Sequence, residues 1–270
     1  MRTEMDMIGS GNQFFAGIDV GSTTTEMVVV NAAGEMLSSA KTATAGDVLG
    51  AIRFVLEVCR QGLGGGSELT LPVVATGYGR AHVACATRAV SEIICYGAGA
   101  HRLEPEVCTI IDIGGQDAKV IRVDAQGKVV DFAMNDKCAA GTGRFLEMLA
   151  HSFQIELDEL ATLAATSQKR LKVSTTCAVF AESEMISLSA QGESRADLLA
   201  AAHRSVAERI AALLRQVGLK SKVMFCGGVA QNAHFAQVLA EELGEALIIP
   251  AQCQMVGALG AALLAARDKN

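Results

Sequence analysis

Two short stretches of the chain carry similar residues in the same order. IDVGSTTTE at positions 18–26 and IDIGGQDAK at positions 111–119 each place an aspartate in an apolar run and a glycine two residues later. The match continues without a gap at a constant offset of 93 residues, as far as the glycines at 34 and 127. A carboxylate at a strand end can hold Mg²⁺ through water, because Mg²⁺ keeps much of its hydration shell. Asp19 and Asp112 are therefore predicted to organise a metal ion and an attacking water.

The residues after each aspartate form a turn suited to phosphate. Backbone N–H groups in such a turn can converge on an anion, and glycine lets the backbone approach a ligand closely. Hydroxyl and amide side chains add donors. The predicted phosphate contacts are Gly21, Ser22, Thr23, Thr24, Thr25, Gly114, Gly115 and Gln116. Gln116 is also a candidate for positioning the attacking water. Two such turns facing each other across a cleft would hold a polyphosphate from both sides, which gives the duplication a function.

A third stretch, KVMFCGGVAQN at 222–232, reads as a strand, a Gly-Gly turn and a helix start. Gly227, Gly228 and Asn232 are predicted to contact the base and ribose of a nucleotide. Taken alone, this stretch could equally be an ordinary loop between a strand and a helix, and a single Asp-x-Gly is most often a strand end and a turn. Two copies in register favour the binding interpretation.

The surrounding pattern predicts two similar α/β domains. β-Branched runs bounded by Gly, Asn and Asp indicate three strands in each repeat, and four amphipathic helices are expected at 47–63, 141–153, 194–218 and 232–244. We place one domain at 12–100 and the other at 107–250, with a C-terminal helix in 254–270 that packs back on the first. The glycine run GLGGGS at 62–67 is followed by no lysine, so it is a surface turn and not a Walker A loop.

Two of the eight cysteines lie in distinctive surroundings. Cys138 in NDKCAAGTGRF and Cys177 in VSTTCAVFAES each follow short polar residues and open a helical pattern. A thiolate at a helix N-terminus is stabilised by unpaired N–H groups and by the helix dipole. None of the cysteines forms a C-x-x-C pair. The alternative for any one of them is a buried, free thiol.

These motifs together resemble a known family. IDVGSTTTE, IDIGGQD and CGGVAQN are similar to motifs of the actin, sugar-kinase and Hsp70 superfamily. ATGYGR at 75–80, MNDKCAAGTGRFLE at 134–147 and CAVFAESE at 177–184 narrow the resemblance to the ATP-dependent activators of 2-hydroxyacyl-CoA dehydratases, which are related to ATPase subunits of benzoyl-CoA reductase. The resemblance implies an α/β fold of two duplicated actin/ribonuclease-H-like domains, with ATP or ADP and Mg²⁺ in a cleft between them.

The resemblance also implies an electron-transfer function. A cubane cluster normally takes four thiolates, so two cysteines per chain are completed most simply by two-fold symmetry. The family is built this way, with one [4Fe–4S] cluster bridging a homodimer, which assigns the cluster to Cys138 and Cys177 of each chain. A ferredoxin or flavodoxin would load the cluster, and ATP hydrolysis would drive an electron to a dehydratase-like or benzoyl-CoA reductase-like iron–sulfur enzyme.

Composition excludes some partners. The net charge is −6 with a sequence pI near 5.4 and no basic stripe, which argues against nucleic acid. No window reaches the ~18–20 apolar residues that span a bilayer, and the N-terminal MRTEMDMIGSGNQ lacks the apolar segment of a signal peptide. We therefore expect a cytoplasmic protein whose cysteines are thiols.

Two other functions are compatible with the same fold. A small-molecule kinase of the aminosugar type would need a general base beside a polar sugar pocket, and the sequence offers no convincing one. A non-redox nucleotide-binding protein would use its cysteines only structurally. Iron content separates both alternatives from the electron-transfer function.

Overall fold

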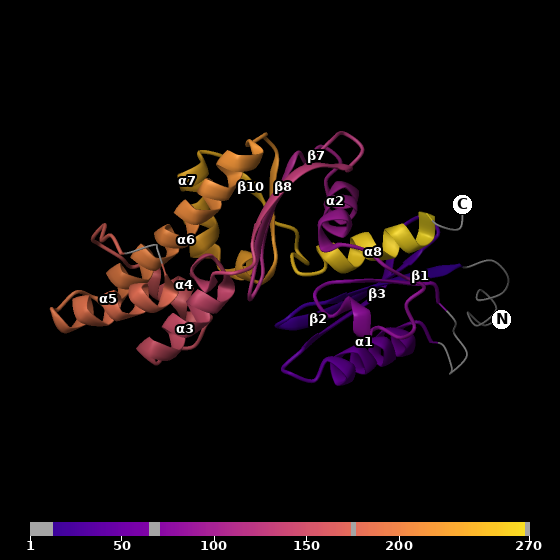
Figure 1. Cartoon of the computed structure of the whole chain (residues 1–270), viewed down its shortest axis with the longest axis horizontal. Coiled ribbons are helices and arrows are strands. Elements are labelled where there is room, and N and C mark those ends of the chain that lie inside the picture. Colours follow the sequence, from indigo (N-terminus) through magenta and orange to yellow (C-terminus); the bar gives the residue numbers. More distant parts are fainter. Residues whose placement is uncertain (1–12, 65–70, 174–176, 268–270) are drawn as a thin grey trace, which may run out of the picture. The chain divides into compact units, whose positions relative to one another are not determined.

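The computed structural model describes residues 13–64, 71–173 and 177–267 of the 270-residue chain (Figure 1). The chain forms two compact units, one of Met1–Arg102 with Met255–Asn270 and one of Leu103–Gln254. Most of the N-terminal segment considered above, and positions 65–67 of the glycine run, lie outside the described residues. No helix in the described ranges is long and apolar enough to cross a membrane.

The first unit is built on a five-stranded sheet in the order β3-β2-β1-β4-β5. β1, β2 and β3 pair antiparallel, while β4 and β5 continue in parallel from β1. The strands are β1 (Phe14–Val20), β2 (Thr24–Asn31), β3 (Met36–Ala43), β4 (Val73–Thr76) and β5 (Arg88–Ala89). Side chains alternate between the two faces of β1: Ile18 and Val20 join the hydrophobic cluster that includes α1, and Phe15 joins the cluster that includes α8.

Three α-helices belong mainly to this unit: α1 (Val48–Gly62), α2 (Glu92–Leu103) and α8 (Val256–Arg267). α8 packs closely on β1 because glycine stands at the contact. A Cβ added to Gly17 would lie 2.1 Å from the carbonyl oxygen of Ala258, and one added to Gly260 would lie 1.8 Å from that of Cys95 in α2. The sequence pattern did not predict α2, whose middle, CYGAGA, is a buried run of mostly small residues with little polar alternation.

The second unit repeats the same sheet in the order β10-β9-β6-β7-β8. Its strands are β6 (Thr109–Ile113), β7 (Ala118–Val123), β8 (Val129–Asn135), β9 (Val223–Cys226) and β10 (Leu247–Ile248). A register shift occurs at Val29/Val30 in one unit and at the equivalent Arg122/Val123 in the other. Gly34 and Gly127 occupy the same turn with φ of +75° and +73°. The duplication seen in the sequence is thus a duplication of backbone geometry.

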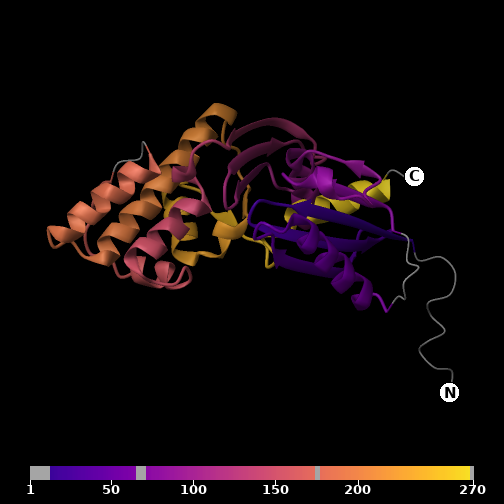
Figure 2. The same ribbon diagram turned by 60° about the horizontal axis from the view of Figure 1, so that its bottom comes forward.

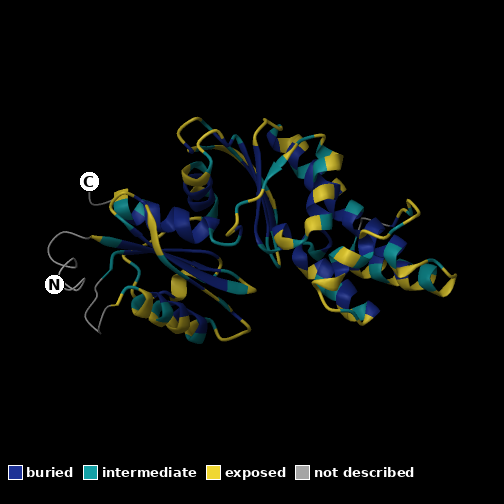
Figure 3. Cartoon of the chain, turned by 180° about the vertical axis from the view of Figure 1, so that it is seen from behind, coloured by how far each residue is buried: buried dark blue, intermediate teal, exposed yellow. Residues whose placement is uncertain are grey.

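Five α-helices complete the second unit: α3 (Gly143–Phe153), α4 (Glu159–Ala164), α5 (Ala178–Ala190), α6 (Arg195–Val217) and α7 (Ala233–Leu243). α6 is the central helix; it packs on α4 and α7 and against β7 and β8, and α5 lies beside it (Figures 1 and 2). The central strands of each sheet are largely buried (Figure 3).

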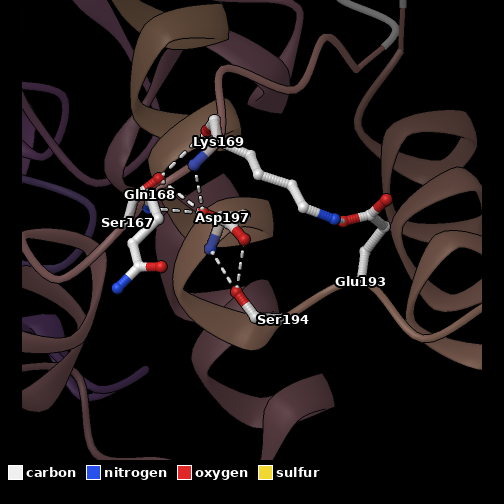
Figure 4. Close-up of polar contacts among 6 residues, drawn as sticks. All are labelled: Ser167, Gln168, Lys169, Glu193, Ser194 and Asp197. Carbon is white, nitrogen blue, oxygen red and sulfur yellow. Dashed lines mark hydrogen bonds and ion pairs between the residues drawn. The ribbon is translucent and has the colours of Figure 1, made fainter.

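Asp197 ties the loop at 167–169 to the start of α6 (Figure 4). Its Oδ1 accepts hydrogen bonds from Ser167 Oγ and from the backbone N–H groups of Gln168 and Lys169, at 2.9, 2.7 and 2.8 Å. Its Oδ2 accepts one from Ser194 Oγ at 2.6 Å, while Ser194 Oγ caps the helix by accepting from Asp197 N–H. The bond from Ser194, followed by those from the loop, holds the pKa of Asp197 well below its usual range. The carboxylate therefore fixes this loop while it is charged.

Candidate nucleotide site and cysteine pair

The two hairpin turns close in the same way. Gly21 N–H donates to the carbonyl oxygen of Thr24 at 2.9 Å, and Gly114 N–H donates to that of Asp117 at 3.0 Å. Ser22, Thr23 and Gln116 are exposed at the tips of these turns. Their side chains are therefore accessible to a ligand.

Thr24 and Thr25 start β2 behind the first turn. Thr24 is partly buried and Thr25 is fully buried. The hydroxyl oxygens of Thr25 and Thr44 are 3.0 Å apart, and Thr44 Oγ1 donates to the carbonyl oxygen of Gly21 at 2.9 Å. This chain of bonds braces the turn from within, so the position of Thr25 suits support of the turn more than direct contact with phosphate.

Asp19 is buried at the end of β1, against glycine on two sides. A Cβ added to Gly77 would lie 2.5 Å from its Oδ1, and one added to Gly257, in the first turn of α8, would lie 2.2 Å from its Oδ2. Glu26 stands directly opposite Asp19 on β2. The two side chains therefore share a face of the sheet, with exposed fractions of only 6% and 5%.

Asp112 has the equivalent place on β6 but a different neighbour. Lys119 stands opposite it on β7, and the Lys119 Nζ lies 3.2 Å from Asp112 Oδ2 and 2.8 Å from Asp117 Oδ2. The backbone of Gly227 covers the other side, since an added Cβ there would meet Asp112 Oδ1 at 2.5 Å. The carboxylate is thus placed by an ion pair and by a glycine of the third motif.

The third motif forms the turn that its residues predict. Gly227 follows β9 with a φ of +87°, and its N–H donates to the carbonyl oxygen of Cys253 at 3.0 Å. Gly228 begins a short 3₁₀ helix and is partly exposed. Asn232 caps α7: its Oδ1 accepts from Phe235 N–H at 2.8 Å, and its Nδ2 lies 3.2 Å from His203 Nε2. The amide oxygen of Asn232 is therefore used to cap α7.

His203 was given no role from the sequence, where no histidine has ligand spacing. It lies fully buried on the apolar face of α6. Burial, followed by the charges of His234 and Arg204, lowers its pKa to about 3, so the ring is neutral at physiological pH. Because Asn232 Nδ2 can only donate to Nε2, the proton sits on Nδ1. His203 therefore anchors the residue that caps α7.

Cys138 and Cys177 both belong to the second unit and are partly exposed. Cys177 is the residue before α5, as the sequence pattern predicts, while the Ser174–Thr176 stretch before it lies outside the described residues. Cys138 precedes a 3₁₀ turn (Ala139–Gly141), and α3 begins only at Gly143. Asn135 clamps Cys138, since Nδ2 donates to its carbonyl oxygen at 2.8 Å and Oδ1 accepts from its N–H at 3.2 Å.

The start of α3 is bonded directly to the second hairpin turn. Gly143 N–H donates to the carbonyl oxygen of Gly114 at 2.9 Å, and Arg144 N–H donates to that of Gly115 at 2.8 Å. Gly143 must be small here, because an added Cβ would lie 3.0 Å from the Gly114 oxygen. The predicted phosphate turn and the segment that begins at Cys138 are therefore mechanically joined.

A side-chain hydrogen bond links the two helices that follow the cysteines. Ser152 Oγ in α3 donates to Glu182 Oε1 in α5. Glu182 thus holds α3 and α5 together. The described residues contain no group of three or more His, Cys, Asp or Glu side chains that could hold a metal ion.

The sequence model of the BadF/BadG/BcrA/BcrD ATPase family matches residues 16–265, which is nearly the whole chain. The protein belongs to this ATPase family.

Relatives of this chain include dehydratase activators. The 2-hydroxyisocaproyl-CoA dehydratase activator of Clostridioides difficile is 41% identical over 249 residues, covering 92% of this chain and 93% of the relative. The (R)-2-hydroxyglutaryl-CoA dehydratase activating ATPase of Acidaminococcus fermentans is 42% identical over 250 residues, covering 92% and 95%. A solved structure of the activator of the 2-hydroxyisocaproyl-CoA dehydratase from Clostridium difficile, with bound ADPNP, superposes with a TM-score of 0.87 at 38% identity, covering 95% of both chains. The family and the actin-like fold expected from the motifs are thereby confirmed.

Proposed function

We propose that this protein hydrolyses ATP to drive electron transfer to a 2-hydroxyacyl-CoA dehydratase. The proposal is supported by the named activities of its relatives at about 40% identity over most of their length. The observation that carries it is the pair of hydrogen bonds from Gly143 and Arg144 to the Gly114–Gly115 turn. Through them, a change at the phosphate turn is transmitted to the segment that starts at Cys138.

The nucleotide is assigned to the three turns. The phosphates of ATP or ADP bind at the hairpin turns, and the base and ribose bind at the Gly227–Gly228 turn. Gly21, Ser22, Thr23 and Thr24 contribute from the first turn, Gly114, Gly115 and Gln116 from the second, and Asn232 contributes at α7. Thr25 contributes by bracing the first turn.

Hydrolysis needs groups that orient water and spread charge rather than a covalent intermediate. A water oxygen bonds to the γ-phosphorus while the bond to the bridging oxygen of ADP breaks, and the water proton passes to phosphate or solvent. Asp19 and Asp112 organise Mg²⁺ through bound water, and Asp112 and Gln116 orient the attacking water. The donor set fits, because Mg²⁺ prefers carboxylate and water oxygens and both aspartates stand at strand ends beside the turns.

The cluster is assigned to thiols from two copies of the chain. Cys138 and Cys177 are partly exposed at the N-terminal ends of helical segments, a position that stabilises a thiolate, and each chain contributes these two. A homodimer supplies four, and a [4Fe–4S] cluster held by them supplies one-electron transfer. Ferredoxin or flavodoxin is the proposed donor and a dehydratase-like iron–sulfur enzyme the acceptor. Thiol ligands and such donors are compatible with the cytoplasm.

Iron and ATP turnover test the proposal together. Purified anaerobically, the protein is expected to be brown, to contain iron and sulfide, and to hydrolyse ATP only with Mg²⁺. Added to a dehydratase with a reduced ferredoxin, it should oxidise that ferredoxin in an ATP-dependent way. Colourless protein that takes up no iron on reconstitution would exclude the electron-transfer function, and efficient phosphorylation of an aminosugar would favour a kinase.

A further inference from the structure

The duplicated hairpins differ at one buried position. In the first, the residue opposite the strand-end aspartate is Glu26; in the second it is Lys119. Both are buried, and they occupy equivalent places, 93 residues apart, on β2 and β7. The two hairpins therefore share a backbone but differ in charge: the strand-end aspartate faces an acidic residue in the first unit and a basic residue in the second.

In the second hairpin, Lys119 holds Asp112 in a buried ion pair. The side chains of Lys119 and Asp112 are only 4% and 2% exposed, and their charged atoms are 3.2 Å apart. Asp117, 22% exposed, is a second carboxylate on the same ammonium at 2.8 Å. The pKa of the neighbouring Cys226 thiol is raised, mainly by burial and then by the charges of Asp112 and Cys253. The Lys119 ammonium therefore occupies the position that a metal ion bound to Asp112 Oδ2 would need.

In the first hairpin the lysine lies one strand further from the aspartate. Lys41 on β3 stands opposite Glu26, so the row across β1, β2 and β3 reads Asp19, Glu26, Lys41. The equivalent row in the second unit reads Asp112, Lys119, Met134. On the antiparallel side, Asp19 thus stands opposite an acid, where Asp112 stands opposite a base.

We propose that Lys119 is a positioning residue that acts through Asp112 and directs the divalent cation to the hairpin of Asp19. This rests on the proposed nucleotide site. Coulomb repulsion by the ammonium disfavours Mg²⁺ at Asp112, whereas the Asp19–Glu26 pair favours it. This narrows the assignment made above for the two aspartates: Asp19 would hold the hydrated metal, and Asp112, fixed by Lys119 and Gly227, would orient the attacking water.

The test replaces Lys119 with methionine, which is similar in length and uncharged. With Mn²⁺ as the probe and saturating ADP, electron paramagnetic resonance titration of the full chain is expected to show affinity for Mn²⁺ stronger by on the order of tenfold. The kcat for ATP hydrolysis should fall, because Asp112 is no longer held in its orientation. The KM for ATP should change little, because the nucleotide keeps its contacts. Asp117→Asn, which keeps the Lys119–Asp112 pair, should leave Mn²⁺ affinity near wild type.

Glu26→Lys gives an independent readout if Lys119→Met does not fold. This substitution gives the first hairpin the positive charge that the second hairpin carries at the equivalent position. It is expected to weaken Mn²⁺ binding by a similar factor. Unchanged or weaker Mn²⁺ binding in Lys119→Met, or unchanged binding in Glu26→Lys, would overturn the inference. Absence of ATP hydrolysis in the wild type would instead count against the proposed function, and the Mn²⁺ titration with ADP would still report on Lys119.

Discussion

At the scale of single residues, the proposed chemistry depends on two carboxylates that neighbouring backbone holds in place. Asp19 lies between Gly77 and Gly257, where any side chain would collide with its oxygens. Such confinement limits the rotamers open to Asp19 and so fixes the direction of its carboxylate. Asp112 is confined too, but by a lysine as well as a glycine.

Asp19→Asn is expected to keep the fold and lose turnover. The amide has nearly the same shape but no negative charge with which to organise Mg²⁺ and its water, so kcat for MgATP hydrolysis should fall about 100-fold. Steady-state phosphate release measures this. The exposed Glu57→Gln on α1 is the control and should behave as wild type. Wild-type turnover in Asp19→Asn would remove the assignment of Asp19.

His203 predicts a dependence of stability on pH. Its pKa is near 3 in the folded protein and about 6.5 when exposed in the unfolded chain. Between these values the unfolded state binds the extra proton, so stability falls as the pH drops below about 6.5 and is fully retained above it. Melting temperatures of the wild type and of His203→Gln from pH 7.5 to 4 test this. The variant should lose less stability over that interval, and parallel curves would contradict the prediction.

At the scale of elements, the N-terminus of α6 and the loop before Cys177 depend on one carboxylate. Asp197 accepts three hydrogen bonds from residues 167–169 and one from Ser194 (Figure 4). Removing it leaves the loop's N–H groups without this acceptor and removes an acid from the first turn of the helix.

Asp197→Ala is therefore expected to lower the melting temperature by several degrees and to speed hydrogen exchange at Gln168 and Lys169. Differential scanning calorimetry and amide exchange measure these effects. Glu193→Gln, which weakens only the exposed ion pair with Lys169, is the matched control and should change the melting temperature little. Equal effects of the two substitutions would show that the loop does not depend on Asp197.

Substitutions at two glycines of α8 are expected to affect activity and stability separately. A methyl group at Gly257 would press on Asp19 Oδ2, while one at Gly260 would meet the backbone of Cys95 and Gly99 in α2. Gly257→Ala should reduce ATP turnover with little loss of stability, since alanine is the better helix former. Gly260→Ala should destabilise the fold by about 1–3 kcal/mol. Turnover and urea unfolding of both variants decide the matter; the reverse pattern would mean that α8 does not position Asp19.

At the scale of the whole molecule, the proposed cluster would link dimer assembly to electron transfer. Each chain offers two partly exposed thiols at helical starts, so a four-thiolate cluster needs two chains. The energy of cluster binding then appears as dimer stability.

Cys177→Ala is expected to abolish stable iron binding and to weaken the dimer while leaving ADP binding intact. Iron analysis should give about two irons per chain for the wild type, as one four-iron cluster per two chains requires. Sizing under anaerobic conditions and an ADP titration complete the test. Cys85→Ala, at an exposed thiol in the first unit, is the control. A full cluster in Cys177→Ala would contradict the ligand assignment.

Much of this architecture is determined locally, and the sequence therefore predicts it. The strand pattern around Asp19 and Asp112, the turns after them, and the helices α1, α3, α6 and α7 follow from period-2 and period-3.6 alternation between apolar and polar residues, with glycine at the turns. The C-terminal helix α8 is expected from an apolar stretch without such alternation. The duplication is equally visible, because the two hairpins keep their residues at a constant offset. Family membership follows from the motifs that these elements carry.

Only the tertiary structure decided which groups face one another. It turned Thr25 inward to Thr44, made Asn232 a helix cap on a buried histidine, and bonded the start of α3 to the Gly114–Gly115 turn. It also formed α2 from a run of small residues whose helicity depends on close packing with α8. These features arise from contacts between residues far apart in the chain. Such contacts depend on strand register, side-chain direction and the space left by neighbouring elements, none of which a local pattern encodes.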